Sequence, residues 1–316
     1  MYSVRFQNIY LGKYSGISSK NENINTDFKI DDLYFNEETF EDAEEKMQRM
    51  IIDSLLKQTK LDLIIGADLT NQLGITNMTM SNYNIPYIGI YNACASFPLG
   101  MILAGKMIKY SNFKSIGVLV SSHNLTAEKT YRYPVEYGSL RKKCETFTAT
   151  GAVVAEVTSR KTNIKIESGT IGRVIDSGVT NSKNMGAVMA IGAYDTLKTH
   201  LKDLKRDISY YDLILTGDLG KIGKSILMDL LKDDDITPNR LIDSGEILLD
   251  KSLIYAGSSG PTCLPLVLLF KMIKSGYKKI LIIGTGALHN QLIANREKNI
   301  PTISHAVSIE VKSWDI

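Results

Sequence analysis

Cys94 is the side chain whose type and position most directly suggest chemistry. It stands in the small-residue stretch YNACASF (residues 91–97), just before a helix that should begin near Ser96–Pro98, because proline suits a first helical turn. A thiol near a helix N-terminus loses its proton more easily, since the helix dipole favours the thiolate. The alternative is an inert buried thiol that lines a pocket, as most free cysteines are buried and unreactive.

His123 and Asn124 follow a strand predicted over Ser115–Ser121, and His289 holds the equivalent place later in the chain. An acyl-transferring cysteine needs a base or an oxyanion partner, commonly a histidine. His123 could fill that role or donate to a carboxylate ligand. It could equally make a structural hydrogen bond at the end of its strand.

A structural metal site is not expected. The four histidines include no pair with metal-ligand spacing, and Cys144 and Cys263 have no CxxC partner. Structural zinc sites use closely spaced pairs of cysteine and histidine ligands.

The segment Thr126–Gly138 (TAEKTYRYPVEYG) is dense in charged and aromatic side chains, among them Glu128, Arg132 and Tyr133. A solvated loop would not need three tyrosines, so we expect this segment to fold over something. It could pack on a partner surface, where tyrosine and arginine are enriched, or close over a ligand as a lid. Arg132, with Arg173 and Arg141 behind it, is the candidate for binding a carboxylate, because a guanidinium matches a carboxylate in bidentate geometry.

Three glycine-rich stretches follow predicted strands, at 217–220, 257–260 and 284–286. Their backbone amides could hold an anion, or the glycines could serve only tight strand-to-helix turns. None of them matches GxGxxG or a Walker loop, so a nucleotide site is weakly supported.

Composition favours an ordinary soluble protein without a nucleic-acid surface. The chain has 316 residues, 44% hydrophobic and 22% charged, and a formal charge of only +3. Its three cysteines have no paired spacing, which predicts free thiols in a reducing compartment. No secretory signal or membrane-length apolar run is visible, so a cytoplasmic location is expected.

Strands and helices alternate along the chain to position these residues, and the same series of elements occurs twice. Long helices are predicted over Asn36–Lys57 and Asn184–Lys202. LDLIIGADLTNQLG (61–74) matches YDLILTGDLGKIG (211–223), and the run from Cys94 through KMIK to His123 matches the run from Ser259 through a second KMIK to His289. Two duplicated α/β halves, residues 1–170 and 171–316, related by a pseudo-twofold axis, are therefore predicted.

A duplicated α/β chain with a cysteine before a buried helix resembles the thiolase-like fold, with central mixed sheets and helices buried between them. More closely, the chain resembles the stage V sporulation protein AD family. The stretches that carry this resemblance are GADLTNQ (66–72), YNACASF (91–97), SSHNLTAEKTYRYPVEYG (121–138), TIGRVIDSG (170–178), NMGAVMA (184–190), DLILTGDLGKIG (212–223), AGSSG (256–260), GTGAL (284–288) and IPTISHAVSIE (300–310). They span nearly the whole chain.

The resemblance implies a non-enzymatic protein that binds dipicolinic acid, a planar aromatic dicarboxylate, for its uptake into the developing spore. Ketoacyl-synthase-like enzymes place a histidine and an asparagine where this chain has Gly217 and Ser258. That substitution favours a binding pocket over the alternative, a Cys94-dependent acyltransferase or condensing enzyme with His123 as base. The ligand-binding residues expected on these grounds are Cys94, His123, Asn124, Glu128, Arg132, Tyr133, Gly217, Asp218, Ser258, Ser259, Gly260 and His289.

The resemblance also sets expectations for partners. Membrane proteins of the SpoVA channel system would receive the ligand and hold the protein peripherally at the spore inner membrane. A homodimer is expected from the fold. No cofactor is expected, and whether calcium accompanies the ligand is left open.

Overall fold

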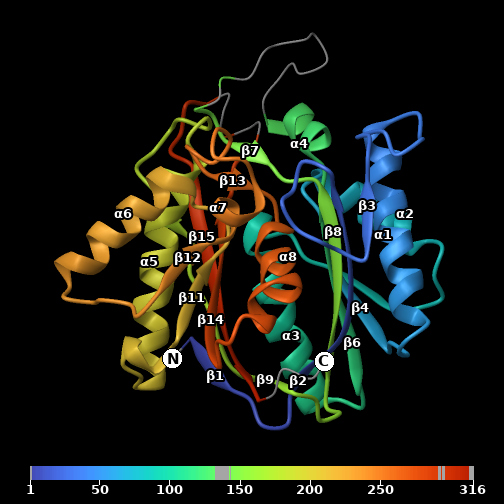
Figure 1. Cartoon of the computed structure of the whole chain (residues 1–316), viewed down its shortest axis with the longest axis horizontal. Coiled ribbons are helices and arrows are strands. Elements are labelled where there is room, and N and C mark those ends of the chain that lie inside the picture. The colour runs from blue at the N-terminus through green and yellow to red at the C-terminus, as the bar shows by residue number, and fades with distance from the viewer. Residues whose placement is uncertain (1, 132–141, 143, 291–292, 294–295, 313–316) are drawn as a thin grey trace.

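The computed structural model describes residues 2–131, 142, 144–290, 293 and 296–312. Within these residues the chain forms five layers, in the order helix, sheet, helix, sheet, helix (Figure 1). Helices α3 (Ser96–Tyr110) and α8 (Cys263–Phe270) form the middle layer. Helices α1 (Phe40–Leu56) and α2 (Gly74–Met80) cover one outer face, and α5 (Met185–Leu204) and α6 (Gly220–Asp233) cover the other.

One continuous sheet supplies both β layers. Its main path runs β12-β11-β14-β15-β9-β2-β8-β6-β4-β5. The strands are β1 (Ser3–Arg5), β2 (Tyr10–Ser19), β3 (Phe28–Ile30), β4 (Leu63–Ala67), β5 (Tyr87–Gly89), β6 (Ser115–Ser122), β8 (Gly151–Thr158), β9 (Ile164–Ile171), β10 (Ile175–Asp176), β11 (Leu213–Thr216), β12 (Leu241–Asp243), β14 (Lys279–Ala287) and β15 (Pro301–Val311). A separate pair joins β7 (Phe147–Thr148) to β13 (Ser258–Ser259).

Short helices complete the connections. They are η1 (Asn71–Leu73), η2 (Ala93–Ala95), α4 (Asn124–Tyr131), η4 (Ile208–Tyr210), α7 (Ser244–Leu248) and η5 (Met272–Lys274). Among the described residues no helix is long and apolar enough to cross a membrane.

The sheet repeats one topology in its two parts. In the first part, β5, β4 and β6 are parallel, and β8 and then β2 follow antiparallel. In the second part, β12, β11 and β14 are parallel, and β15 and then β9 follow antiparallel. β9 therefore holds in the second part the place that β2 holds in the first, so the topological division falls between β8 and β9, near residue 160. The division into residues 1–170 and 171–316 stays a prediction.

Three apolar clusters hold the layers together. The largest packs α3 and α8 between the inner faces of both sheet parts. A second lies beneath α5 and α6, and a third beneath α1. β4, β6 and β8 are buried along their whole length, as strands covered by helices on both faces must be. By contrast, α1 buries one stripe and caps its first turn with Thr39.

Two local expectations were wrong. The glycines at 284 and 286 lie inside β14 and not in a loop after it. A Cβ on Gly284 would come within 2.7 Å of Pro98, so glycine here lets the strand approach the start of α3. The segment from residue 126 is also not a loop from its start, because α4 continues to Tyr131.

Candidate functional site

Cys94 lies where the middle layer meets the second part of the sheet. It sits in η2, and α3 begins two residues later, as expected. The preceding residue, Ala93, has φ of 47°, a left-handed conformation that costs a non-glycine residue about 1–3 kcal/mol. β14 packs directly on this turn, since a Cβ on Gly286 would lie 2.9 Å from the Asn92 carbonyl oxygen. The turn that presents the thiol is therefore held by both halves of the chain.

Asp218 and Gly260 are the partners of the thiol. The Gly260 N–H donates to Cys94 Sγ (3.1 Å) and to Asp218 Oδ2 (3.2 Å). The Thr285 hydroxyl donates to Asp218 Oδ1 (2.5 Å). Asp218 is fully buried and Cys94 is 7% exposed. The structure thus brings together three residues that the sequence placed at the site, Cys94, Asp218 and Gly260, around one shared amide.

This environment keeps the thiol protonated. Burial raises the pKa of Cys94 well above its usual range, and the neighbouring Asp218 carboxyl raises it further. The Gly260 amide acts in the opposite direction but does not offset these effects. Burial likewise raises the pKa of Asp218. The expected lowering of the thiol pKa by the helix dipole is therefore overridden, because the site is desolvated and the nearest ionisable side chain is acidic.

Asp243 anchors the turn that carries Asp218. It accepts hydrogen bonds from the Thr216 hydroxyl (2.8 Å) and from the backbone amides of Leu219 (2.9 Å) and Gly220 (3.1 Å). These amides open α6, so Asp243 satisfies the start of that helix. Burial raises the pKa of Asp243 to about 6. Asp218 therefore does not have to accept from the amides at the start of α6, and its carboxyl lies beside Gly260 and Cys94.

Ser122 is a site residue that was not predicted. A Cβ on Gly260, whose φ is 141°, would come within 2.6 Å of Ser122 Oγ. The Ser122 hydroxyl also donates to the Ala149 carbonyl (2.8 Å) and shares a hydrogen bond with Thr262 Oγ1 (2.8 Å). The sequence could have indicated Ser122, because neighbouring side chains on a strand point to opposite faces. If His123 faces outward, Ser122 faces the middle layer.

His123 does face outward. Its Nε2 lies 2.8 Å from the Leu33 carbonyl, and its Nδ1 accepts from the Leu125 amide at 3.2 Å. The ring stacks on Phe40 of α1, with centroids 5.3 Å apart. Burial lowers the pKa of His123 to about 4, so the ring is neutral with the proton on Nε2. Both nitrogens are engaged in backbone hydrogen bonds, and the structure does not bring His123 to Cys94.

The other predicted residues lie at several places. The backbone amide of Asn124 donates to Thr150 Oγ1 (2.9 Å). Glu128 is buried within α4. His289 is buried just after β14. Gly217 lies beside Thr285, whose hydroxyl oxygen would be 3.0 Å from a Cβ at this position.

Ser258 and Ser259 are described by their backbone alone, and Arg132, Arg141 and Tyr133 lie outside the described residues. The backbone of Ser258 and Ser259 pairs with β7 immediately before Gly260. The alternative carboxylate binder, Arg173, is exposed and forms a bidentate ion pair with Asp195. No group of three or more His, Cys, Asp or Glu side chains suited to a metal occurs among the residues that the structure describes.

Comparisons with known proteins identify relatives in sequence and in fold. The family model described as stage V sporulation protein AD (SpoVAD) matches residues 9–310. The stage V sporulation protein AD of Bacillus subtilis (strain 168) is 33% identical over 295 residues, which is 90% of this chain and 87% of that protein.

Solved structures of two enzyme types share the fold. The 3-oxoacyl-[acyl-carrier-protein] synthase III of Aquifex aeolicus VF5 matches with a TM-score of 0.60 and 15% identity, over 96% of this chain and 99% of that one. An OleA variant of Xanthomonas campestris, bound with cerulenin, matches with a TM-score of 0.61 and 15% identity, over 96% and 97%. The thiolase-like α/β fold expected from the sequence is confirmed.

Proposed function

The chain belongs to the stage V sporulation protein AD family, and we propose that it acts in sporulation as a non-enzymatic binding protein for dipicolinic acid. In this proposal it supports uptake of the ligand into the developing spore and passes it to membrane proteins of the SpoVA system. The protein would act at the spore inner membrane through those partners.

The state of Cys94 carries the non-enzymatic part of the proposal. An acyl-transfer nucleophile works as a thiolate, activated by a base or a cationic neighbour. Cys94 instead neighbours the Asp218 carboxyl, and its pKa is raised by burial and by that carboxyl. His123, the substitute base considered from sequence, is occupied on another face of the sheet. These contacts favour a thiol that forms part of a pocket wall and stays chemically unchanged.

The same contacts constrain how an anionic ligand would bind. A carboxylate at this site would compete with Cys94 and Asp218 for the Gly260 amide, which donates to both, and the buried Asp218 would repel a bare dianion. The ligand would therefore meet Asp218 in its protonated form. A resident calcium site does not fit the residues beside Cys94, because calcium takes six to eight oxygen ligands and the described side chains there offer mainly Asp218 and Thr285.

Calorimetric titration with dipicolinate tests the binding. Isophthalate, which keeps both carboxylates and lacks the ring nitrogen, serves as the control ligand. Arg132→Ala should weaken dipicolinate binding about 10- to 100-fold, the value of one hydrogen bond to a charged group. Arg173→Ala, which removes an arginine already paired with Asp195, is the matched control and should bind as the unaltered chain does.

A parallel incubation with acyl-CoA tests the enzymatic alternative. Intact-protein and peptide mass spectrometry should find no acyl group on Cys94. An acyl adduct on Cys94 in a protein that gives no heat with dipicolinate would overturn the binding proposal in favour of an acyltransferase.

We also propose that the protein is a homodimer paired through β5. This strand forms one end of the sheet path, so its outer edge carries unpaired backbone groups. Apolar side chains are exposed on and beside it, namely Met78 (60%), Ile88 (38%) and Tyr91 (47%). Pairing two copies at this edge would cover them, close to the turn that holds Cys94.

A further inference from the structure

A cavity lies at the opposite end of the strands from Cys94. It has a volume of about 650 Å³ and is formed where β2, the end of β8, the loop from residue 160 to 163 and the end of η5 meet. The size falls within the range of ligand pockets, roughly 300–1,000 Å³. Ser115, which donates to Glu156 of this cavity, and Ser122, beside Gly260, mark the two ends of β6. The cavity and the Cys94 site are therefore about 23 Å apart at about 3.3 Å per residue.

The rim of this cavity is basic. Four cationic side chains line it, Lys13, Arg160, Lys161 and Lys274, and all four are exposed. Two more exposed lysines flank it. Lys60 follows Thr59, whose hydroxyl accepts from Arg160 (2.5 Å), and the Lys114 carbonyl accepts from the Ser159 amide (3.1 Å). We call these six residues the basic rim.

The acidic groups nearby do not neutralise the basic rim. Glu156, the buried acid of the cavity, accepts from the Thr59 and Ser115 hydroxyls (2.9 and 2.5 Å), from the Lys13 backbone amide (3.1 Å) and from Arg160. Its charge is thus compensated inside the protein. Asp27 lines the cavity and accepts from the Gly16 amide (2.9 Å).

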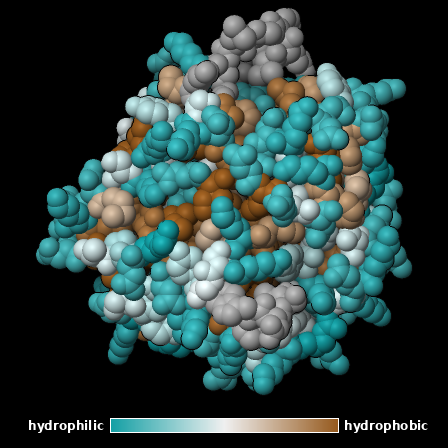
Figure 2. Space-filling view, in the orientation of Figure 1, coloured by the Kyte–Doolittle hydropathy of each residue, from teal (hydrophilic) through white to brown (hydrophobic). Residues whose placement is uncertain are grey.

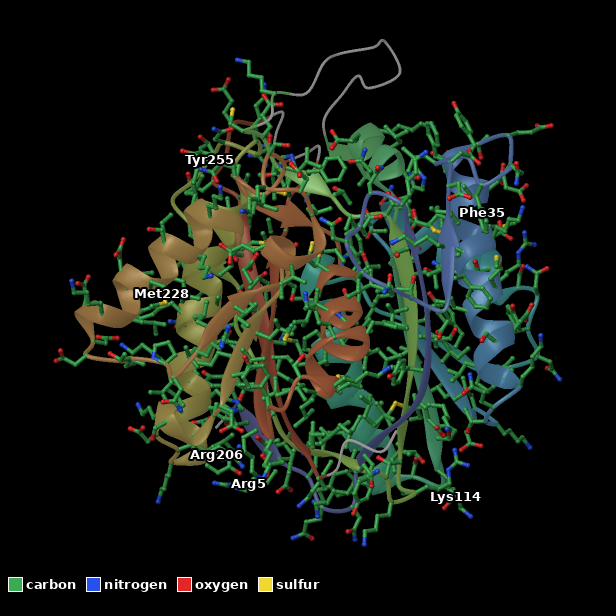
Figure 3. All side chains as sticks on the ribbon, viewed as in Figure 1. Arg5, Phe35, Lys114, Arg206, Met228 and Tyr255 are labelled. Carbon is green, nitrogen blue, oxygen red and sulfur yellow. The ribbon has the colours of Figure 1, made fainter. Side chains whose placement is uncertain are left out.

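The rim lysines are left for an external partner. Within the described part of the chain, no ion pair engages the ammonium groups of Lys13, Lys60, Lys114, Lys161 or Lys274. The six cations stand against three acids, Glu156, Asp27 and Asp62, of which Glu156 is buried and Asp62 accepts from the Lys114 and Ser115 backbone amides (2.8 and 3.1 Å). Figure 3 places Lys114 at the lower end of the molecule, opposite the end that carries α4 and β7. The lower margin of the described surface is also largely hydrophilic (Figure 2).

We propose that the basic rim docks the protein directly on an anionic lipid bilayer, with the phosphate of an acidic phospholipid headgroup entering the cavity. The charges complement such a surface, and Lys13, Arg160, Lys161 and Lys274 line the cavity that would receive the phosphate. The neighbouring lysines on both flanks suit a broad planar surface better than a single small anion. Nucleic acid is disfavoured, because the chain as a whole carries a charge of only +3.

This docking would fix the orientation of the protein. With the basic rim on the bilayer, the Cys94 site lies at the far end of the sheet and faces the aqueous phase. Direct lipid contact is separate from the proposed binding of dipicolinate and does not depend on it.

Flotation with lipid vesicles tests the proposal. The full chain is mixed with vesicles of phosphatidylcholine alone or with 30% phosphatidylglycerol, at low and at physiological salt. The protein should float with the anionic vesicles only, and less at higher salt. The triple variant Lys13→Gln, Lys161→Gln, Lys274→Gln should partition about 100-fold less, since each basic residue near such a surface contributes about fivefold.

A second triple variant separates position from charge. Lys221→Gln, Lys232→Gln and Lys251→Gln remove two exposed lysines on α6 and one after α7, and should leave vesicle binding nearly unchanged. Equal loss in both triple variants, or none in the first, would overturn the proposal. Binding of inorganic phosphate or of a DNA duplex that depends on the basic rim, without vesicle binding, would also overturn it. Dipicolinate calorimetry on the first triple variant should be unaffected, so the two proposals fail independently.

Discussion

Replacing Asp218 by asparagine should make Cys94 more reactive. Cys94 Sγ and Asp218 Oδ2 both lie within 3.2 Å of the Gly260 nitrogen, so they are at most about 6 Å apart. Unit charges at that distance interact by about 3 kcal/mol at an effective dielectric constant of about 20. An ionised Asp218 therefore suppresses the Cys94 thiolate by about 100-fold. Asparagine removes this charge and can still accept from Gly260.

The pH dependence of this effect identifies its cause. At low pH Asp218 is protonated, so the asparagine variant and the unaltered chain should be alkylated at similar rates. As the pH rises and Asp218 ionises, the variant should become faster, by up to about 100-fold. A constant ratio of rates across the pH range would point to altered access to the thiol and not to charge.

Alkylation by iodoacetamide, followed by peptide mass spectrometry, measures the rate at each cysteine. Cys144 is exposed and serves as an internal reference in every sample, and thermal melting checks that the variant is folded. In the unaltered chain Cys94 should react at least about 100-fold more slowly than Cys144, because burial limits both access and ionisation. Alkylation of Cys94 as fast as Cys144 would refute the assignment of a protonated, sheltered thiol.

Three further outcomes follow from the same contacts. Gly260→Ala should weaken dipicolinate binding and lower the free energy of unfolding more than Gly276→Ala does. Both glycines have positive φ, but only a Cβ at position 260 meets Ser122. Equal losses for the two variants in calorimetry and in urea unfolding would contradict this. Burial lowers the pKa of His123 from 6.5 to about 4, so its contribution of about 3 kcal/mol is present above pH 6.5 and lost as the pH falls towards 4. Urea unfolding of His123→Gln should then show a shallower acid decline than the unaltered chain, and parallel declines would exclude this role. Ile88→Glu on the β5 edge should convert a particle of twice the 35.1 kDa chain mass to one of 35.1 kDa in light scattering, whereas a monomeric unaltered chain would refute the dimer.

Much of the fold could be predicted because the buried elements have simple local signals. The apolar run at β6 and the acid-rich start of α1 gave their bounds within a few residues. The internal repeat predicted the duplicated topology that the sheet displays. The pairing of strands was less accessible, since β2 separates β8 from β9 in the sheet and strand pairing is not encoded by local pattern.

Three of the predicted site residues lie close together in the structure, but their chemistry could not be predicted. Cys94, Asp218 and Gly260 could be placed by the repeat and the glycine turns. The direction of the thiol pKa could not, because it depends on which side chain shares its desolvated space. His123 was assigned to the same site because it is close in sequence to the end of β6. The alternation of side chains across that strand sends it to α1 and leaves Ser122 at the site.

Asp68 and Asp218 occupy equivalent positions in the repeat. The difference in their hydrogen bonds explains why Asp218, and not Asp68, belongs to the site. In the first half, Asp68 accepts from the Thr76 amide (2.8 Å) and hydroxyl (2.6 Å), and so satisfies the start of α2. In the second half, Asp243 performs the corresponding task for α6. Asp218, the counterpart of Asp68, is thereby released from capping and turns to Cys94 and Gly260. Asp68→Asn should therefore cost stability, because a helix start loses its acceptor, while Asp218→Asn should mainly change the reactivity of the thiol. That asymmetry between matched positions is what separates a structural residue from a site residue in this fold.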